Sequence, residues 1–578
     1  MQTVRRLYLY LLSGISLGVL STGAWFALRV LLDSLGIGHG GQLGGPNINR
    51  EQLTVALSLI GVGLPVWGIH WWLAERGVRG TSSGHDAERG STLRALYLSA
   101  VLAASFGFGA FAAVDLVREL VLAVGGGRSF GEFDSFDLAG SLAALVISGS
   151  VWGYHLSVRR RDLDGSALVA AAAWLPRVYL YGVALIALQL VFLGAADLVR
   201  IVADALLSSS SVVADDQFRR AMLAGGVSTV VVGGAAWLGH WWYARRLLAD
   251  PGWRGASERP ARMRVAYFVV VVLASAALVV GHLADVVRAV LGPTLEADRI
   301  VLLGGTSVDL AREVFVALGA AALPALAWWQ HQRWMRAEAD ERDQFGAGPA
   351  AERLDRYAVA LVGLGYAAFG LAWLLGLLID VTLGGTRTST GDGFWRVEFA
   401  NFAGFALAGS VPWLWEWSRT VSRLAADPNA ESGSTVRRTY LLIALAGAVI
   451  AGIGSLGVIL YRLFGSLLGV SLGGNPVSEL STPTGFLVLA LAIGTYHGLA
   501  ARADQARREA APAAPDALAG AQAAVEAMAA AAPAAAAPAA AAPGGRMLVL
   551  SGPPGEDLTA AIDGLRNALP QGYRLDDG

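Results

Sequence analysis

Two residue types are missing from the sequence. Its 578 residues include no cysteine and no lysine, so all 44 Lys+Arg positions are arginine. Without cysteine, disulfide scaffolds, all-cysteine zinc sites, iron–sulfur clusters and thiol nucleophiles are excluded. Without lysine, Schiff-base chemistry, a Walker A phosphate loop and a lysine general base are excluded. The net charge of −1 gives no bulk attraction to nucleic acid.

Charge of either sign is also scarce. Charged residues make up 15% of the chain, against about 25% in soluble domains. Hydrophobic residues make up 55%, and the mean hydropathy is +0.52. This much apolar surface has to face lipid. Because lipid disfavours open sheet edges and no alternating pattern of strand length occurs, we expect an all-α integral membrane protein.

Two landmarks recur six times along the chain. The first is a tyrosine near the start of an apolar segment, at Tyr8, Tyr97, Tyr179, Tyr267, Tyr357 and Tyr440. The second is a histidine or glutamate 57 to 64 residues later, at His70, His155, His240, His331, Glu416 and His497. Two landmarks that recur at a nearly constant spacing from each other indicate duplication.

Each repeat contains two apolar stretches of about 20 residues or more, enough to cross the bilayer as helices. The sequence therefore predicts twelve transmembrane helices as six tandem two-helix repeats in parallel orientation. The expected boundaries are 1–90, 91–172, 173–258, 259–349, 350–432 and 433–510, followed by an Ala/Pro-rich disordered linker at 511–545 and a small β-α-β-like tail at 546–578.

Arginine placement predicts the orientation. The N-terminus, the links between repeats and the residues after the last apolar stretch hold 28 arginines, whereas the loops inside the repeats hold eight. Because positive loops stay on the cytoplasmic side, we expect a multi-pass plasma-membrane protein with both termini in the cytoplasm.

The first candidate site is an Asp-x-x-Arg motif near the outer end of the first helix of a repeat. It occurs as Asp115 and Arg118, Asp197 and Arg200, and Asp285 and Arg288. Positions i and i+3 share a helix face, so each pair can interact within one helix. Two interpretations stay open: a paired interfacial anchor, or an outer ring of charge that gates a solute or binds a lipid headgroup.

The second candidate is a Trp-x-x-His motif at the inner end of the second helix. It occurs as Trp67 and His70, Trp152 and His155, Trp237 and His240, and Trp328 and His331. An aromatic belt with basic flanks is the interpretation that we favour, because indole and imidazole suit the lipid interface. A metal or haem site formed by converging histidines and a proton-responsive ring are the alternatives.

Polar residues near the bilayer centre are few. Gln189 lies ten residues after its tyrosine, and His282 lies three residues before Asp285 on the same helix face. No carboxylate is expected at the midplane, which argues against an ion-coupled transporter. We assign no catalytic residue, cofactor or metal site.

The arginine-rich opening with tyrosines, the long first span ending in Leu-Arg-x-Leu-Leu and the closing Trp-x-x-His together resemble a bacterial membrane-domain family of unknown function. That family occurs in tandem copies in chloroflexus-like and related bacteria. The resemblance covers about residues 1–505 and implies no activity or catalytic residues.

We therefore expect a non-enzymatic scaffold or sensor, with lipid as its surroundings and a protein partner for the C-terminal tail. A homo-oligomer is compatible with this hypothesis. The alternative is a channel or transporter for a small solute, with a pathway between the repeats lined by Gln189, His282 and the outer Asp/Arg pairs.

Overall fold

The computed structural model describes eleven stretches of the chain. They are residues 2–37, 46–79, 88–124, 138–165, 173–207, 216–259, 261–295, 310–343, 348–385, 394–469 and 473–510. The predicted linker and tail, at 511–578, lie outside the described residues. Contacts divide the chain into two compact parts, Met1–Arg502 and Ala503–Gly578, and only the end of the last helix is described in the second part.

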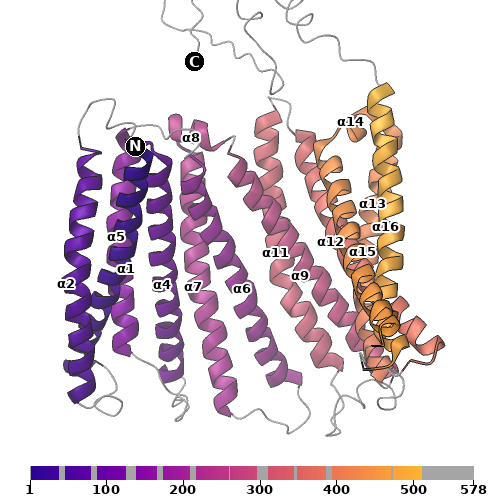
Figure 1. The fold of residues 1–578 in the computed structure, drawn as a ribbon, viewed down its shortest axis with the longest axis horizontal. Coiled ribbons are helices and arrows are strands. Elements are labelled where there is room, and N and C mark those ends of the chain that lie inside the picture. The colour runs from indigo at the N-terminus through magenta and orange to yellow at the C-terminus, as the bar shows by residue number, and fades with distance from the viewer. Residues whose placement is uncertain are drawn as a thin grey trace, which may run out of the picture. The chain divides into compact units, whose positions relative to one another are not determined.

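The described residues are helical and include no strand. The long helices are α1 (Gln2–Ser34), α2 (Pro46–Arg76), α4 (Thr92–Val124), α5 (Leu138–Gly165), α6 (Leu175–Leu207), α7 (Asp216–Leu248), α9 (Arg262–Thr294), α11 (Leu310–Asp343), α12 (Gly348–Thr382), α13 (Phe394–Ala426), α15 (Thr435–Leu467) and α16 (Pro476–Ala510). Two short helices, α8 (Trp253–Glu258) and α14 (Pro428–Ser432), lie in links between them (Figure 1).

Length and composition make this a multi-pass membrane protein. Eleven of the described helices are long and apolar enough to cross a bilayer. Helical structure follows from the apolar runs, because a helix satisfies its own backbone hydrogen bonds where no water is present. The expected twelfth span, α13, is not among the eleven. It is less apolar because Glu398 and Glu416 bound its uncharged stretch and Asn401 and Pro412 lie inside it.

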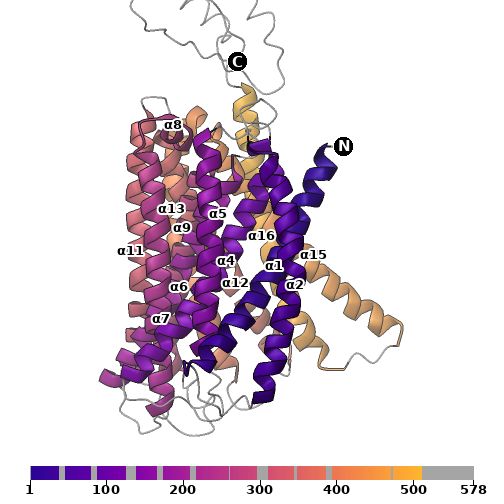
Figure 2. The same cartoon turned by 90° about the vertical axis from the view of Figure 1, so that its left-hand side faces the viewer.

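The long helices pack in pairs as antiparallel hairpins, α1 with α2, α4 with α5, α6 with α7, α9 with α11 and α12 with α13 (Figure 1). In the sixth hairpin α15 meets α16 through Tyr440 and His497. Further contacts of α1 with α5 and of α6 with α11 join hairpins two at a time. We call α1, α2, α4 and α5 the first group, α6, α7, α9 and α11 the second group, and α12, α13, α15 and α16 the third group. Figure 2 shows α1 and α2 beside α4 and α5 in the first group.

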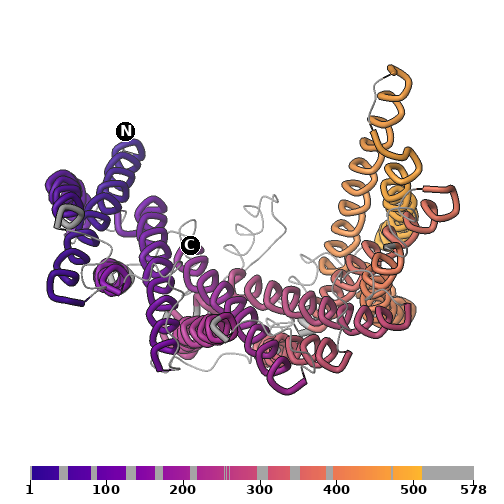
Figure 3. The backbone as a smooth tube through the Cα atoms, turned by 90° about the horizontal axis from the view of Figure 1, so that it is seen from below, coloured from indigo at the N-terminus to yellow at the C-terminus, as the bar shows by residue number. Residues whose placement is uncertain are grey.

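Each group contacts the next through the same pair of helix positions. The third helix of the first group, α4, packs on the second helix of the second group, α7. In the same way α9 packs on α13 of the third group. Viewed along the helices, the chain passes through the groups in sequence order (Figure 3).

Glycine allows the hairpin helices to approach closely. A Cβ atom added at Gly194 of α6 would lie 2.8 Å from the carbonyl oxygen of Gly226 in α7. One added at Gly63 of α2 would lie 2.7 Å from the backbone nitrogen of Leu20 in α1. Such contacts leave no room for a side chain, so the small residues set the distance between these helices.

We predict that Gly194→Leu lowers the stability of the second group by about 1–3 kcal/mol, because the new side chain forces α6 and α7 apart. The matched control is Gly182→Leu on the same helix, where an added Cβ meets nothing within 4 Å. Thermal unfolding in detergent compares the two. Equal melting temperatures for both variants would contradict the prediction.

Candidate functional site

The two sequence landmarks bind each other. In five of the six hairpins the tyrosine hydroxyl at the start of the first helix lies 3.1 to 3.3 Å from the histidine Nε2 near the end of the second helix. The pairs are Tyr8–His70, Tyr97–His155, Tyr179–His240, Tyr267–His331 and Tyr440–His497. An antiparallel hairpin brings these two helix ends to the same level, which explains why the two landmarks keep step.

The partner of Nδ1, the second ring nitrogen, determines the histidine tautomer. In each of these five histidines Nδ1 lies 2.7 to 2.9 Å from the carbonyl oxygen four residues earlier. A carbonyl only accepts, so Nδ1 carries the proton and Nε2 of the neutral ring accepts from the tyrosine. Every polar atom of the imidazole is therefore used inside the protein.

A tryptophan from the preceding hairpin binds the same tyrosine hydroxyl. Trp152 Nε1 donates to Tyr179 at 2.8 Å, and Trp237 Nε1 donates to Tyr267 at 3.0 Å. In the third group Trp413 Nε1 donates to Tyr440 at 3.2 Å. The Trp–Tyr–His chain thus joins the end of one hairpin to both helices of the next. Trp67 differs, since it packs edge-on against Tyr154 with ring centroids 6.3 Å apart.

In the fifth hairpin Tyr357 was assigned to the wrong position of the repeat. Tyr357 does not contact position 416; its hydroxyl donates to Glu431 Oε1 at 2.6 Å, as Tyr10 and Tyr181 donate to Glu88 and Glu258. The counterpart of Tyr8 and Tyr179 is Asp355, two residues earlier, which accepts from Trp328 Nε1 at 3.4 Å. In this hairpin the Tyr–His pair is replaced at both positions by acids, Asp355 and Glu416.

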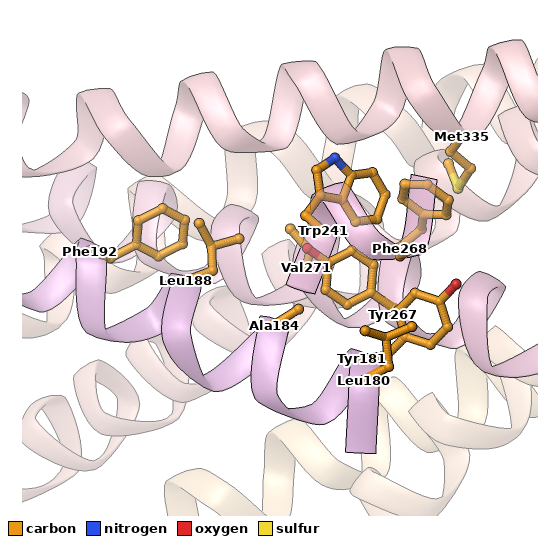
Figure 4. Packing of buried hydrophobic residues seen from close by; sticks show 11 residues of the cluster. Leu180, Tyr181, Ala184, Leu188, Phe192, Trp241, Tyr267, Phe268, Val271 and Met335 are labelled. Carbon is orange, nitrogen blue, oxygen red and sulfur yellow. The ribbon is translucent and has the colours of Figure 1, made fainter. Parts of the chain in front are cut away.

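A second tryptophan stacks on the tyrosine of the second hairpin in each group. The ring centroids of Trp241 and Tyr267 (Figure 4) lie 5.3 Å apart with an interplanar angle of 24°. The guanidinium of Arg264 lies 5.1 Å from the centroid of the Trp241 ring. The same stack consists of Trp71, Tyr97 and Arg94 in the first group and of Trp417, Tyr440 and Arg437 in the third. Stacking and cation–π attraction hold the two helices of each stack together at this level.

The stacked arginines of the first two groups are buried and paired with carboxylates. Arg94 donates from Nε to Asp162 and from a terminal nitrogen to Glu75, both at 2.6 Å. Its side chain is 0% exposed and those of its partners are 4–5% exposed. Arg264 binds both carboxylate oxygens of Glu338. Arg161 donates to the other oxygen of Glu75, so two arginines face the two carboxylates of the first group.

A glutamate in the link between the two hairpins closes each group. Glu88, Glu258 and Glu431 each accept from the first-helix tyrosine through one oxygen and from an arginine of that helix through the other. The arginines are Arg6, Arg177 and Arg353. The three glutamates lie nine residues before Tyr97, Tyr267 and Tyr440. That fixed spacing is the signal that our sequence interpretation missed.

For four of the histidines, the aromatic belt at the lipid interface that the sequence favoured is the wrong interpretation. His155, His331 and His497 are each 1% exposed, and His240 is 9% exposed. A side chain at this burial lies between helices, not against lipid. The spacing of the motif did not reveal this, because its partners come from another helix and from the preceding hairpin.

The three Asp-x-x-Arg motifs differ from one another. Asp197 and Arg200 form an i,i+3 ion pair at 2.7 Å, and Asp285 and Arg288 lie 3.8 Å apart. Arg118 lies 3.9 Å from Glu119. Arg288 also contacts Glu313 of α11, at 3.3 Å. The side chains of the two paired motifs are 38–49% exposed, so these interactions are weak.

The proposed pathway residues Gln189 and His282 do not line the cavity that the structure shows between α1, α4 and α5. Gln189 Nε2 is buried without a hydrogen-bond partner among the described residues, and His282 Nδ1 lies 3.4 Å from Asp285. A cavity of about 700 Å³ lies between α1, α4 and α5. Its lining includes Gly14, Gly18 and Asp115 but neither Gln189 nor His282.

Comparison with known proteins identifies one family. Three stretches of the chain, 6–146, 177–318 and 353–495, match the domain of unknown function DUF5671. The chain belongs to this family. No curated protein and no solved structure is similar to it. The expected resemblance to a tandemly repeated family of unknown function is confirmed.

The three DUF5671 copies coincide with the three helix groups. They begin at Arg6, Arg177 and Arg353, the arginines that bind the link glutamates. This register aligns Tyr8 and Tyr179 with Asp355, which independently supports the correction above. One family copy thus covers most of two of the hairpins that the sequence predicted as separate repeats.

The polar side chains of the site bind one another. Its tyrosines, histidines, link glutamates and the arginines Arg94 and Arg264 are used in bonds to one another. Within the described part of the chain, no three His, Cys, Asp or Glu side chains gather as metal ligands. The arrangement can orient hairpins and hold them at one depth.

We predict that Tyr267→Phe lowers the free energy of unfolding by about 1–3 kcal/mol, because it leaves buried Trp237 Nε1 and His331 Nε2 without their shared partner. Tyr8→Phe is the control, since Tyr8 makes the same histidine bond but is 56% exposed. Denaturant titration in mixed micelles measures both. A loss for Tyr8→Phe as large as that for Tyr267→Phe would contradict burial as the cause.

Proposed function

We propose that this protein is a non-enzymatic scaffold or sensor of the plasma membrane, with twelve transmembrane helices and a tethered cytoplasmic tail that recruits a protein partner. One observation carries the proposal. The polar residues that recur in every copy bond to one another and hold hairpins together, so the repeated machinery serves assembly and not turnover of a substrate.

The inner ends of the helices support this assignment. Each group closes its link with an Arg–Glu–Tyr clamp, and both described short helices, α8 and α14, lie in such links. Links held in this way present a fixed surface at one end of the helices. A tethered tail that binds a partner would bring that partner to the membrane.

Function can be tested by removing the tail. Deletion of 511–578 leaves the membrane helices intact, so we expect the truncated protein to insert and to melt at the same temperature as the full chain. In-cell proximity labelling from the N-terminus should then lose a protein that the full chain labels. Unchanged labelled proteins would contradict recruitment by the tail.

The same two proteins, reconstituted in liposomes, separate a scaffold from a channel. A scaffold gives efflux of entrapped ions and small dyes equal to that of empty liposomes. Efflux above this background that Gln189→Leu abolishes would favour the channel and overturn the proposal.

The orientation has a direct test, because the chain has no cysteine of its own. We predict that Ser34→Cys, at the exposed outer end of α1, reacts with an impermeant maleimide in intact cells. Ala430→Cys, exposed in α14, should react only after the cells are opened. Both substitutions leave the backbone hydrogen bonds of the helices in place, and Ser34→Cys removes only the exposed bond from Ser34 Oγ to the Leu31 carbonyl. Labelling of Ala430→Cys in intact cells would reverse the assigned orientation.

A further inference from the structure

Arg159 of α5 is a buried cation that no carboxylate of the described residues neutralises. It is 8% exposed, and one of its terminal nitrogens, Nη1, is buried without a hydrogen-bond partner. Its guanidinium lies 5.6 Å from the ring centroid of Tyr179 in α6. Among the described residues, no ion pair or hydrogen bond of its side chain is recorded. Arginine does not lose its proton in proteins, so the charge remains.

The groups around Arg159 do not neutralise it. Those close enough to act on it electrostatically are the hydroxyls of Tyr179 and Tyr243 and the guanidinium of Arg160. Arg94, in contrast, is also buried but bonds to Glu75 and Asp162. An uncompensated buried charge is strongly unfavourable, whereas a paired one is tolerated. Carboxylates of the described residues neutralise Arg94 but not Arg159.

The position of Arg159 suits an anion from the inner side. It is the first residue of the Arg159–Arg160–Arg161 run at the inner end of α5, and Arg160 and Arg161 are exposed. It lies where the first group meets the second, beside the bond from Trp152 to Tyr179. The site thus combines a buried guanidinium, a solvent-facing guanidinium and tyrosine hydroxyls. Arginine binds phosphate oxygens through paired, charge-assisted hydrogen bonds.

The junction of the second and third groups has a related feature. Arg356 of α12 is 3% exposed, and both of its terminal nitrogens are buried without hydrogen-bond partners. Glu352 and Glu431 act on it electrostatically, so its charge is partly balanced. Arg356 is not at the equivalent position of its copy. The stronger candidate is therefore Arg159.

We propose that Arg159, with Arg160 and the hydroxyl of Tyr243, binds a phosphate group at the junction of the first and second groups. The phosphate is supplied either by the headgroup of an anionic phospholipid of the inner leaflet or by free phosphate. The bound anion neutralises Arg159 and stabilises the contact between the two groups. The proposal is independent of the scaffold function.

The test measures the melting temperature of the full chain in nanodiscs. The reference is phosphatidylcholine in a buffer without phosphate, and the two additions are phosphatidylglycerol in the disc and inorganic phosphate in the buffer. We expect one of them to raise the melting temperature of the unaltered protein by about 3 °C or more. If only phosphatidylglycerol raises the melting temperature, the ligand is a lipid headgroup. If inorganic phosphate raises it, the ligand is the free anion.

Two variants assign the effect to the site. Arg159→Met should melt at or above the unaltered protein in the reference disc, because it removes an unpaired buried charge, and should not respond to the anion. Arg333→Gln removes an arginine charge from an exposed position on α11, outside the site, and should keep the full response.

Three results would overturn the proposal. The first is no response of the unaltered protein to either anion, which needs no variant to fold. The second is an equal response in Arg159→Met. The third is a large destabilisation of Arg159→Met in the reference disc, which would mean that stacking on Tyr179 is the whole role of Arg159.

Discussion

Between membrane helices there is no water to satisfy a hydroxyl, an indole nitrogen or an imidazole, so each needs a protein partner. The Trp–Tyr–His chain meets this need with three side chains. The tryptophan donates to the tyrosine, the tyrosine donates to the histidine, and the histidine donates to its own helix backbone. Since the tryptophan belongs to the preceding hairpin, satisfying these atoms also fixes how successive hairpins meet.

Around this chain the hairpins alternate between two kinds. The second hairpin of each copy adds a stacked arginine and a glutamate in the link before it, whereas the first hairpin contributes the arginine and tyrosine that bind this glutamate. The alternation explains why the family repeat contains two hairpins. Asp355 and Glu416 occupy the two positions that form the Tyr–His hydrogen bond in the other hairpins, so both partners of that bond are replaced in the fifth hairpin.

Composition and apolar run length were sufficient to predict an all-helical membrane protein, and the two landmarks marked the hairpins. What they could not reveal was pairing between helices. Tyr8 and His70 were found as separate features, and their contact depends on the antiparallel packing of α1 on α2. The ion pairs of Arg94 join residues up to 68 positions apart, and no local periodicity records such a distance. The constant nine-residue step from each link glutamate to its tyrosine was available in the sequence and would have shown the two kinds of hairpin.

A double-mutant cycle between Trp237→Phe and Tyr267→Phe tests most directly whether the Trp–Tyr–His chain couples one hairpin to the next. The free energy of unfolding of the unaltered protein, the two single variants and the double variant would be measured under the same conditions. We expect a coupling energy of about 1 kcal/mol or more, because the two side chains share one buried hydrogen bond. Additive effects of the two substitutions would show that the hairpins are held together by packing alone and would contradict the account.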